Sequence, residues 1–163
     1  MSTSRRDFLA TSLAGFVTAA FARPGLARVL LRPGQEPVFT PIRRGVGYFT
    51  MQGGTIGYLV NDDGVVVVDT QFPEPAKAFL EGLNTRSGGR PVDILLNTHH
   101  HGDHTGGNSV FRGVAKRVVA HEKAAEHLRQ PPGGGQTPED QLFPDTTFTE
   151  SWSADVGDER VTA

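Results

Sequence analysis

The fold and the chemistry of this chain are decided by one stretch, Asn97-Thr98-His99-His100-His101-Gly102-Asp103-His104-Thr105-Gly106-Gly107-Asn108. It holds four of the six histidines of the chain within six positions, with a carboxylate between them. Neutral imidazole nitrogens and an anionic oxygen are the ligands that divalent transition metals prefer in proteins. The stretch therefore predicts a metal site.

The spacing of the ligands indicates how they divide. Side chains alternate in direction along an extended segment, so His99 and His101 point to one side and can hold one ion. Asp103 and His104 are adjacent and leave the backbone in different directions, which lets them reach a second ion from a tight turn. His100 is out of phase with these residues, so we expect it to point away and to pack rather than bind metal.

An apolar run leads into the histidines. Val92-Asp93-Ile94-Leu95-Leu96 is short and rich in buried-type residues, which predicts a strand with the ligands at its carboxyl end. Ligands on a rigid strand end are held better than ligands on a free loop. Gly106 and Gly107 are expected to keep side chains out of the mouth of the site. The ordered set argues against the alternative, a solvated histidine-rich loop that binds metal by chance.

The pattern His-x-His-x-Asp-His after a buried strand resembles the signature of the metallo-β-lactamase-fold hydrolases. The resemblance covers residues 46–163 and implies an α/β (α+β) fold, the αββα sandwich of two sheets with helices on both outer faces. Only the first half of that sandwich is expected here, as a mixed sheet with helices on its outer face. The resemblance assigns His99 and His101 to a first zinc ion, and Asp103 and His104 to a second.

The implied activity is that of a metal-dependent hydrolase. It would cleave an ester, thioester or amide (β-lactam-like) bond of a small-molecule substrate with a metal-bound hydroxide, which Asp103 orients as the catalytic residue. The signature does not specify the substrate, because related loops serve many reactions. Iron and manganese are alternative metals to zinc.

The family takes further ligands from its later half, and no histidine follows His127 in this sequence. The site is therefore expected to be incomplete in this chain. Two other functions stay open: a non-catalytic metal-binding fragment, and an iron-dependent oxidoreductase of the same fold.

Asp69 is a further candidate site residue. It closes the continuous apolar run Val65-Val66-Val67-Val68, which predicts a fully buried strand. A carboxylate at a strand end can cap the strand, or it can hold a metal ligand through a hydrogen bond. Both roles stay open, although the resemblance places an Asp near the metals without binding them. His121 and His127, at a predicted strand end and on a predicted helix, are not expected to bind metal.

The remaining elements follow from turn residues and apolar periodicity. Val46–Thr70 has the pattern of a β-meander, and Pro75–Asn84 has an apolar stripe with helical spacing. The other predicted elements are a short helix at 108–112, a strand at 117–120, a helix at 122–130, and strands at 146–151 and 160–163 on either side of an Asp-Val-Gly-Asp turn. Trp152, the one tryptophan, is expected in the core or at an edge.

The N-terminal region predicts targeting rather than fold. Ser4-Arg5-Arg6-Asp7-Phe8-Leu9 and the mildly apolar residues after it resemble a twin-arginine signal peptide over 1–27. That resemblance implies recognition by the twin-arginine export machinery and a periplasmic or extracellular location. The apolar part is too short for a stable membrane span, and a disordered or amphipathic N-terminus is the alternative. Residues 28–45, with three prolines and no periodicity, are predicted to form a linker or irregular edge.

Composition excludes some classes of function. The net charge is −2, from 16 basic and 18 acidic residues. Three Arg and one Asp lie in residues 1–27, so the rest of the chain has 13 basic and 17 acidic residues. Such a chain lacks the basic face expected of a nucleic-acid-binding protein. It also has no cysteine, which excludes disulfides and thiolate ligands.

Overall fold

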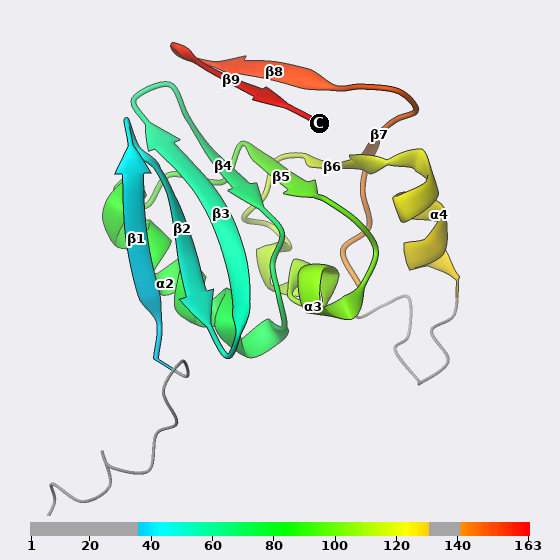
Figure 1. Cartoon of the computed structure of the whole chain (residues 1–163), viewed down its shortest axis with the longest axis horizontal. Helices are drawn as coiled ribbons and strands as arrows, with labels where there is room; N and C mark the ends of the chain where they lie inside the picture. The colour runs from blue at the N-terminus through cyan, green and yellow to red at the C-terminus, as the bar shows by residue number, and fades with distance from the viewer. Residues whose placement is uncertain (1–35, 131–140) are drawn as a thin grey trace, which may run out of the picture. The chain divides into compact units, whose positions relative to one another are not determined.

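The computed structural model of the chain describes residues 36–130 and 141–163. In this part seven strands form one sheet, in the order β1-β2-β3-β4-β5-β6-β7 (Figure 1). Strands β1 to β4 pair antiparallel as a meander, and β4 to β7 pair in parallel. The strands are β1 Val38–Arg43, β2 Val46–Met51, β3 Gly54–Asn61, β4 Gly64–Val68, β5 Ile94–Asn97, β6 Val118–His121 and β7 Thr146–Phe148. The mixed sheet predicted from the sequence is confirmed.

The central strands are buried on both faces, as their continuous apolar runs predict. Side chains of a strand alternate between faces, so Val65 and Val67 enter one hydrophobic cluster while Val66 enters another. In the same way Leu95 of β5 belongs to the first cluster and its neighbours to the second. The strand that carries the histidines is therefore fixed from both sides.

Helix α2, Pro73–Ser87, covers the first face. Its Phe79 is fully buried and contacts the rings of Phe49 and Phe111 at centroid distances of 5.5 and 6.4 Å. Pro73 opens the helix, where its missing N–H costs nothing, and Gly88 ends it with a left-handed φ of 66°. The helix is longer at both ends than the predicted range 75–84. At its C-terminal end this is because Gly88, which ends the helix, lies beyond the apolar stripe.

The other helices are short: α3 Gly102–Thr105, the 3₁₀ helix η2 Asn108–Phe111, and α4 Glu122–Arg129. Helix α4 buries Ala124 and Ala125 and packs against β6 and β7. His121 caps its N-terminus by accepting a hydrogen bond from the Lys123 N–H at 3.1 Å. These helices bracket the carboxyl ends of the parallel strands, where the histidines lie.

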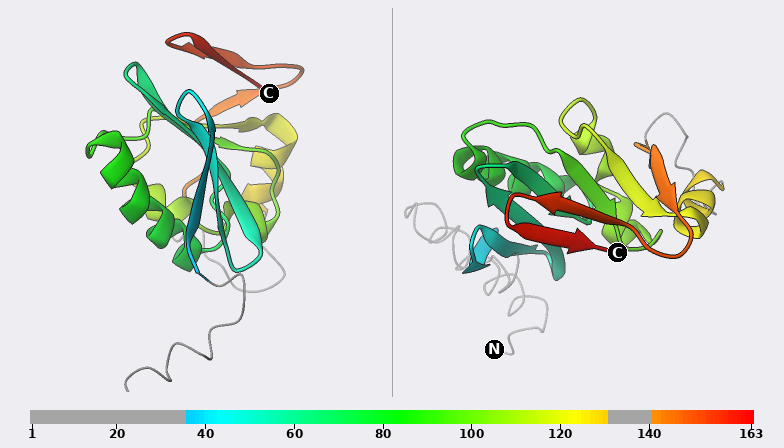
Figure 2. Two further views of the ribbon diagram at one scale, coloured as in Figure 1. Left: turned by 60° about the vertical axis from the view of Figure 1, so that its left-hand side comes forward. Right: turned by 90° about the horizontal axis from the view of Figure 1, so that it is seen from above.

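A hairpin of β8 Ser153–Val156 and β9 Glu159–Thr162 lies on the opposite side of the sheet from α2 (Figure 2). Val156 joins the second hydrophobic cluster, and Trp152 packs against it, as expected for a core or edge residue. Arg43 holds the hairpin through two hydrogen bonds of 2.6 and 3.0 Å to the buried carboxylate of Glu159. The second face of the sheet is thus partly covered.

Three predictions about these regions can be compared with the structure. Residues 38–43, predicted as a linker or irregular edge, form the edge strand β1, whose register with β2 shifts between Pro41 and Arg43 and whose Phe39 packs on Phe49 at 4.9 Å. Proline is accepted at a sheet edge although it cannot donate to a ladder. The strand predicted over 146–151 ends at Phe148, and the first strand of the hairpin, 153–156, was not predicted.

The predicted signal peptide at 1–27 lies outside the described residues. Among the residues that are described, no helix has the length and apolar character needed to cross a membrane.

Candidate metal centre

Two adjacent parallel strands deliver the parts of the centre. β4 and β5 pair through Val68 and Leu96, so the residues that follow them meet at the same edge. Asp69 directly follows β4, and its N–H donates to the Leu96 carbonyl at 2.8 Å. Asp69 has a left-handed φ of 62°, which Asp tolerates better than most residues. The chain therefore turns with the Asp69 carboxylate close to the histidine loop.

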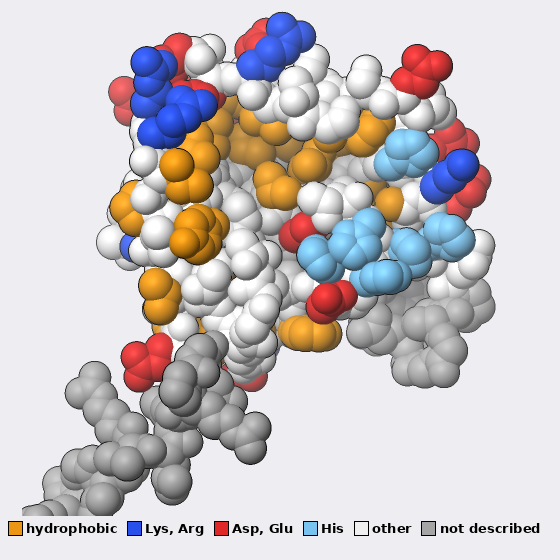
Figure 3. All heavy atoms as spheres, viewed as in Figure 1, with side chains coloured by type: hydrophobic (Ala, Val, Ile, Leu, Met, Phe, Trp, Pro, Cys, Tyr) orange, Lys and Arg blue, Asp and Glu red, His pale blue; other side chains and the backbone are white. Residues whose placement is uncertain are grey.

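The loop after β5 brings three potential ligands together. One nitrogen or oxygen atom from each of His99, Asp103 and His104 lies within 4.8 Å of the others. Asp103 and His104 are on the single turn of α3, and His101 stands at its N-cap. Histidine side chains form a band on this face of the molecule, with carboxylates beside it (Figure 3). The arrangement gathers imidazole nitrogens and a carboxylate around one point.

Asp69 determines which ring nitrogen of His104, and through Thr98 which ring nitrogen of His99, carries the proton. Its carboxylate accepts from His104 Nδ1 at 2.8 Å and from the hydroxyl of Thr98 at 2.7 Å. An ionised carboxylate only accepts, so the proton of His104 is on Nδ1 and the lone pair on Nε2. The Thr98 hydroxyl donates its hydrogen to Asp69, so it can only accept from His99. His99 Nδ1, which lies 3.1 Å from Thr98 Oγ1, is therefore the donor of that hydrogen bond. Both rings therefore have an unprotonated Nε2.

The free nitrogen of His104 faces a carboxylate. His104 Nε2 lies 3.6 Å from Asp103 Oδ2, too far for a good hydrogen bond. Zinc bonds to nitrogen and carboxylate oxygen at about 2.0–2.2 Å, so an ion fits between these atoms. Asp69 therefore contacts a ligand of the candidate centre and is not itself in the group of three.

His101 lies beside this group of three. Its ring packs against that of His99 at a centroid distance of 4.8 Å, but its nitrogens are not in the group formed by His99, Asp103 and His104. The side chain is exposed, and the backbone of His101 is extended at the N-cap of α3. The structure gathers His99, Asp103 and His104 around a single point, and the division of the ligands into a His99–His101 pair and an Asp103–His104 pair stays a prediction.

A buried polar cluster under the loop was not found by the sequence analysis. Asn97 and Asn108 donate to each other's carbonyl oxygens at 3.1 and 2.8 Å, and the Thr70 hydroxyl donates to Asn108 Oδ1 at 2.9 Å. The three side chains tie β4, β5 and η2 together. A polar residue at the end of the apolar run that forms β5 was the available signal, since a buried Asn requires partners.

The glycines of the loop have a different role from the one expected. A Cβ on Gly107 would lie 2.5 Å from the Thr70 carbonyl oxygen and 2.6 Å from Ala76 Cβ. Gly106 and Gly107 are buried. They are required by the close approach of the loop to the chain after β4, rather than by an open mouth.

The other histidines are placed as follows. His100 is half-buried, and its ring stacks on that of His127 from α4 at 4.5 Å. Burial, followed by the neighbouring imidazoles of His127, His101 and His99, lowers the pKa of His100 below its usual value, so this ring is neutral at neutral pH. His121 contacts the Thr149 carbonyl at 2.9 Å and lies apart from the group of three.

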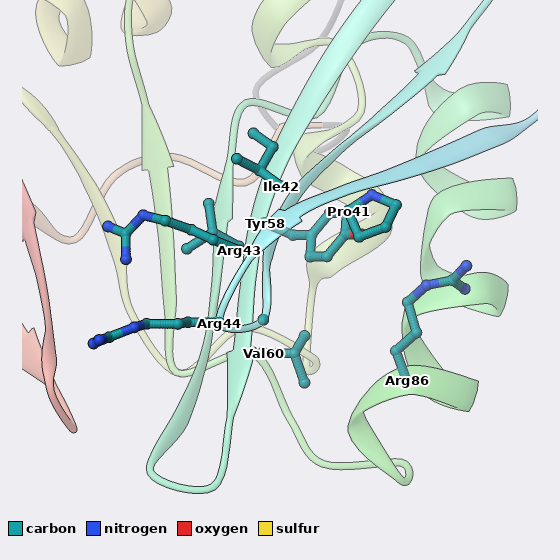
Figure 4. Close-up of a pocket in the computed structure, with 9 residues that line it drawn as sticks. Pro41, Ile42, Arg43, Arg44, Tyr58, Val60 and Arg86 are labelled. Atoms are coloured by element: carbon teal, nitrogen blue, oxygen red, sulfur yellow. The ribbon is translucent and has the colours of Figure 1, made fainter.

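A hollow of about 390 Å³ lies around the β1–β2 turn, and none of its lining residues is a histidine. Arg43 and Arg44 extend from one side of it and Arg86 stands on α2 at the other (Figure 4). Arg43 and Arg44 are already paired with Glu159 and Asp158 at 2.6 and 2.9 Å. Arg86 donates to the Gly82 carbonyl at 2.8 Å and lies over the Phe39 ring, so the guanidinium groups around the hollow are all engaged by neighbouring residues.

Comparison with known proteins agrees with this placement. The family model of the metallo-β-lactamase superfamily matches residues 51–163, which include the whole histidine loop. The chain belongs to the metallo-β-lactamase superfamily. Members of this superfamily bind metal ions, typically zinc, and the His-Asp-His group of this chain is of the type that they use.

Solved metallo-β-lactamases share the fold. The enzyme from Pontibacter korlensis is 24% identical with a TM-score of 0.59, and the match covers 77% of this chain and 58% of that one. The subclass B3 enzyme BJP-1 of Bradyrhizobium japonicum is 24% identical with a TM-score of 0.60, covering 79% of this chain and 52% of that one. The chain thus spans about half the length of these metallo-β-lactamases.

A characterised relative has a different activity. The chain is 34% identical over 108 residues to the 2,4-dinitroanisole O-demethylase subunit alpha of Nocardioides sp. (strain JS1661). That match covers 63% of this chain and 32% of the relative. The name of this relative describes removal of a methyl group from an aromatic ether, and the match spans about a third of its length.

Proposed function

We propose that the protein is a zinc-dependent hydrolase of small molecules, with an ester, thioester or amide bond as its target. The observation that supports this is the group of His99, Asp103 and His104, with the His104 ring fixed by Asp69. Such a set supplies neutral nitrogens and an anionic oxygen from a rigid strand end. A chance cluster of surface histidines would not have a buried carboxylate setting its tautomers.

The donor set fits zinc. His99 and His104 would hold the metal through Nε2 and Asp103 through its carboxylate, with His101 beside them as a further imidazole. A bound zinc ion would lower the pKa of a coordinated water to about 7 and would polarise a carbonyl oxygen.

The chain's own residues prepare that chemistry. Asp69 and Thr98 keep the protons of His104 and His99 on Nδ1, which holds both rings in the ligating tautomer. The Asp103 side chain is 60% exposed, so its carboxylate can accept a hydrogen bond from an incoming water and orient it. The hydrogen-bonded pair of Asn97 and Asn108 keeps the strand end and η2 in register beneath the site.

The test uses the chain and its Asp103→Asn variant, with Asp62→Asn as a control at an exposed turn. Zinc content is measured by elemental analysis, and turnover is measured on a β-lactam, a thioester and an aryl ester. We expect the unaltered chain to bind zinc and hydrolyse at least one substrate class, and Asp103→Asn to lose about 100-fold or more in rate. Retained hydrolysis with normal zinc content in Asp103→Asn would contradict the mechanism. Zinc binding without any turnover would identify a non-catalytic metal-binding fragment instead.

A second candidate follows from the O-demethylase relative, at 34% identity over 108 residues. We propose that this chain would catalyse such a reaction hydrolytically: water attacks the ring carbon of an electron-poor aromatic methyl ether, its oxygen stays on the ring as a phenol, and the methoxy group leaves as methanol. With 2,4-dinitroanisole in ¹⁸O-labelled water, labelled phenol and unlabelled methanol are expected. Formaldehyde with oxygen consumption would indicate the iron-dependent oxidoreductase alternative, and no product would exclude this substrate class.

We also propose that the protein is exported through the twin-arginine route. The support is the sequence Ser4-Arg5-Arg6-Asp7-Phe8-Leu9, which lies outside the described residues. Intact-mass measurement of the protein from its host should show the loss of about the first 27 residues. Replacing Arg5 and Arg6 by Lys should leave an uncleaved protein in the cytoplasm, and unchanged export would refute the assignment.

A further inference from the structure

Five of the six histidines form an unbroken series of ring contacts. Successive centroid distances are 4.0 Å from His104 to His99, 4.8 Å to His101, 4.7 Å to His100 and 4.5 Å to His127. The first members belong to the candidate metal centre. The last two, His100 and His127, take no part in the group formed by His99, Asp103 and His104. The band in Figure 3 is therefore longer than one metal centre requires.

The two outer rings come from different elements. His100 lies in the loop after β5 and is half-buried, whereas His127 is exposed on the last turn of α4. Their planes are inclined by only 27°, so the rings lie nearly face to face. Among the described residues, neither ring has a hydrogen-bond partner, and the imidazole of His127 is exposed.

We propose that His100 and His127 form a second, weaker site for a divalent transition-metal ion such as Zn²⁺, Ni²⁺ or Cu²⁺. Imidazole nitrogens are suited to these ions and poorly suited to Ca²⁺ or Mg²⁺. Metal–nitrogen bonds of about 2.0–2.1 Å require two nitrogens to converge. Because His127 is exposed, its ring can turn to meet that of His100 without disturbing the core.

The surroundings favour a cation at this place. The C-terminal end of a helix has a partial negative charge, and His127 lies in the last turn of α4. Arg129 in the same turn is directed away, since it donates to the Pro144 carbonyl at 3.2 Å. Burial of Ala124 and Ala125 fixes the helix, so the position of His127 relative to the loop is set by the fold.

With only two protein ligands, the ion would complete its coordination with water, which makes the site weaker than the centre at His99 and His104. The His101 ring touches both His99 and His100, so the second ion would lie directly beside the first centre. This site goes beyond the proposed hydrolase activity and does not depend on it, because it requires only binding of metal.

The experiment counts bound zinc by equilibrium dialysis and elemental analysis. It compares the unaltered chain with His127→Asn and with His121→Asn, a control that removes a different histidine and keeps a residue able to cap α4. We expect His127→Asn to bind one ion fewer per chain in the weaker class, while His121→Asn binds as many as the unaltered chain. In NMR titrations the ring signals of His100 and His127 should move together in the last binding step.

Equal stoichiometry and affinity in His127→Asn would overturn the proposal. The same loss in both variants would also overturn it, because it would show nonspecific binding by surface histidines. Circular dichroism of both variants confirms folding, which exposed His127 is not needed to maintain. Turnover does not enter this test, so a failure of the hydrolase proposal would leave its outcome unaffected.

Discussion

Replacing Asp69 by Asn should weaken both zinc binding and the fold. The carboxylate accepts three hydrogen bonds, from the Thr98 N–H at 2.8 Å, the Thr98 hydroxyl at 2.7 Å and His104 Nδ1 at 2.8 Å. An amide in either orientation turns a donor toward at least one of these donors. The ring of His104 then loses the partner that keeps its proton on Nδ1.

The structure sets the size of both effects. The Asp69 side chain is 8% exposed, but that of His104 is 34% exposed, so water can replace part of the lost bond. We therefore expect about 1–3 kcal/mol less stability toward unfolding. Loss of a carboxylate that orients a metal-binding His typically reduces affinity about 10–100-fold, which corresponds to about 1.4–2.7 kcal/mol of binding free energy.

The assay is competition for zinc against a chromophoric chelator, together with thermal unfolding of the metal-free chain. Asp62→Asn, at the exposed β3–β4 turn, is the matched control and should bind zinc as the unaltered chain does. If Asp69→Asn bound zinc with unchanged affinity while remaining folded, the argument that Asp69 sets the tautomer of His104 would be refuted.

Three further predictions concern the framework of the centre. Phe79→Ala should cost about 3–5 kcal/mol in chemical denaturation, because Phe79 is fully buried between α2 and the sheet; a cost below about 1 kcal/mol would contradict the packing. Arg43→Ala should cost about 1–2 kcal/mol, because it removes both hydrogen bonds to buried Glu159 and leaves that carboxylate only the more distant Arg44 at 4.0 Å. Arg44→Ala, whose close pair with Asp158 is exposed, should change stability by less than about 1 kcal/mol; equal costs would show that the hairpin is not held by the Arg43 pair. Burial alone would raise the pKa of Asp93, but hydrogen bonds from Lys116 and the Val65 N–H hold it below the usual value of 3.8. The carboxylate should therefore stabilise the fold above about pH 4 and lose that effect as the pH falls through its folded-state pKa. The stability difference between the unaltered chain and Asp93→Asn should shrink in acid, and a difference that stays constant down to pH 2 would contradict this.

The sequence predicted the central strands and the histidine loop well, for a physical reason. A run such as Val65–Val68 is apolar at every position, so it can only be a strand buried on both faces. The helix over α2 likewise showed its apolar stripe. In each case the local pattern and the tertiary environment favour the same structure.

The elements that were missed depend on contacts distant in the sequence. β1 contains Pro41 and has little alternation, and it is a strand because it pairs with β2 and places Phe39 on the aromatic cluster. The hairpin strand 153–156 is held by Val156 under the sheet and by Glu159 on Arg43. No local pattern contains those partners.

In the candidate metal centre, too, local sequence patterns predicted some features, and contacts distant in the sequence decide the others. Residue types identified His99, Asp103 and His104 as candidates, and the strand ending at Asp69 placed its carboxylate nearby. His101 is extended at the N-cap of α3, and its assignment as a ligand beside His99 stays a prediction. The buried pair of Asn97 and Asn108 depends on the packing of η2 under β5, which the sequence alone does not specify.

The central claim is that His99, Asp103 and His104 bind a transition metal. The most direct measurement is the visible absorption of the chain titrated with Co²⁺, compared with His104→Ala and with His121→Asn. The account predicts ligand-field bands of a low-coordinate cobalt site in the unaltered chain and in His121→Asn, and their loss in His104→Ala. Absence of these bands in the unaltered chain, or their persistence in His104→Ala, would contradict it.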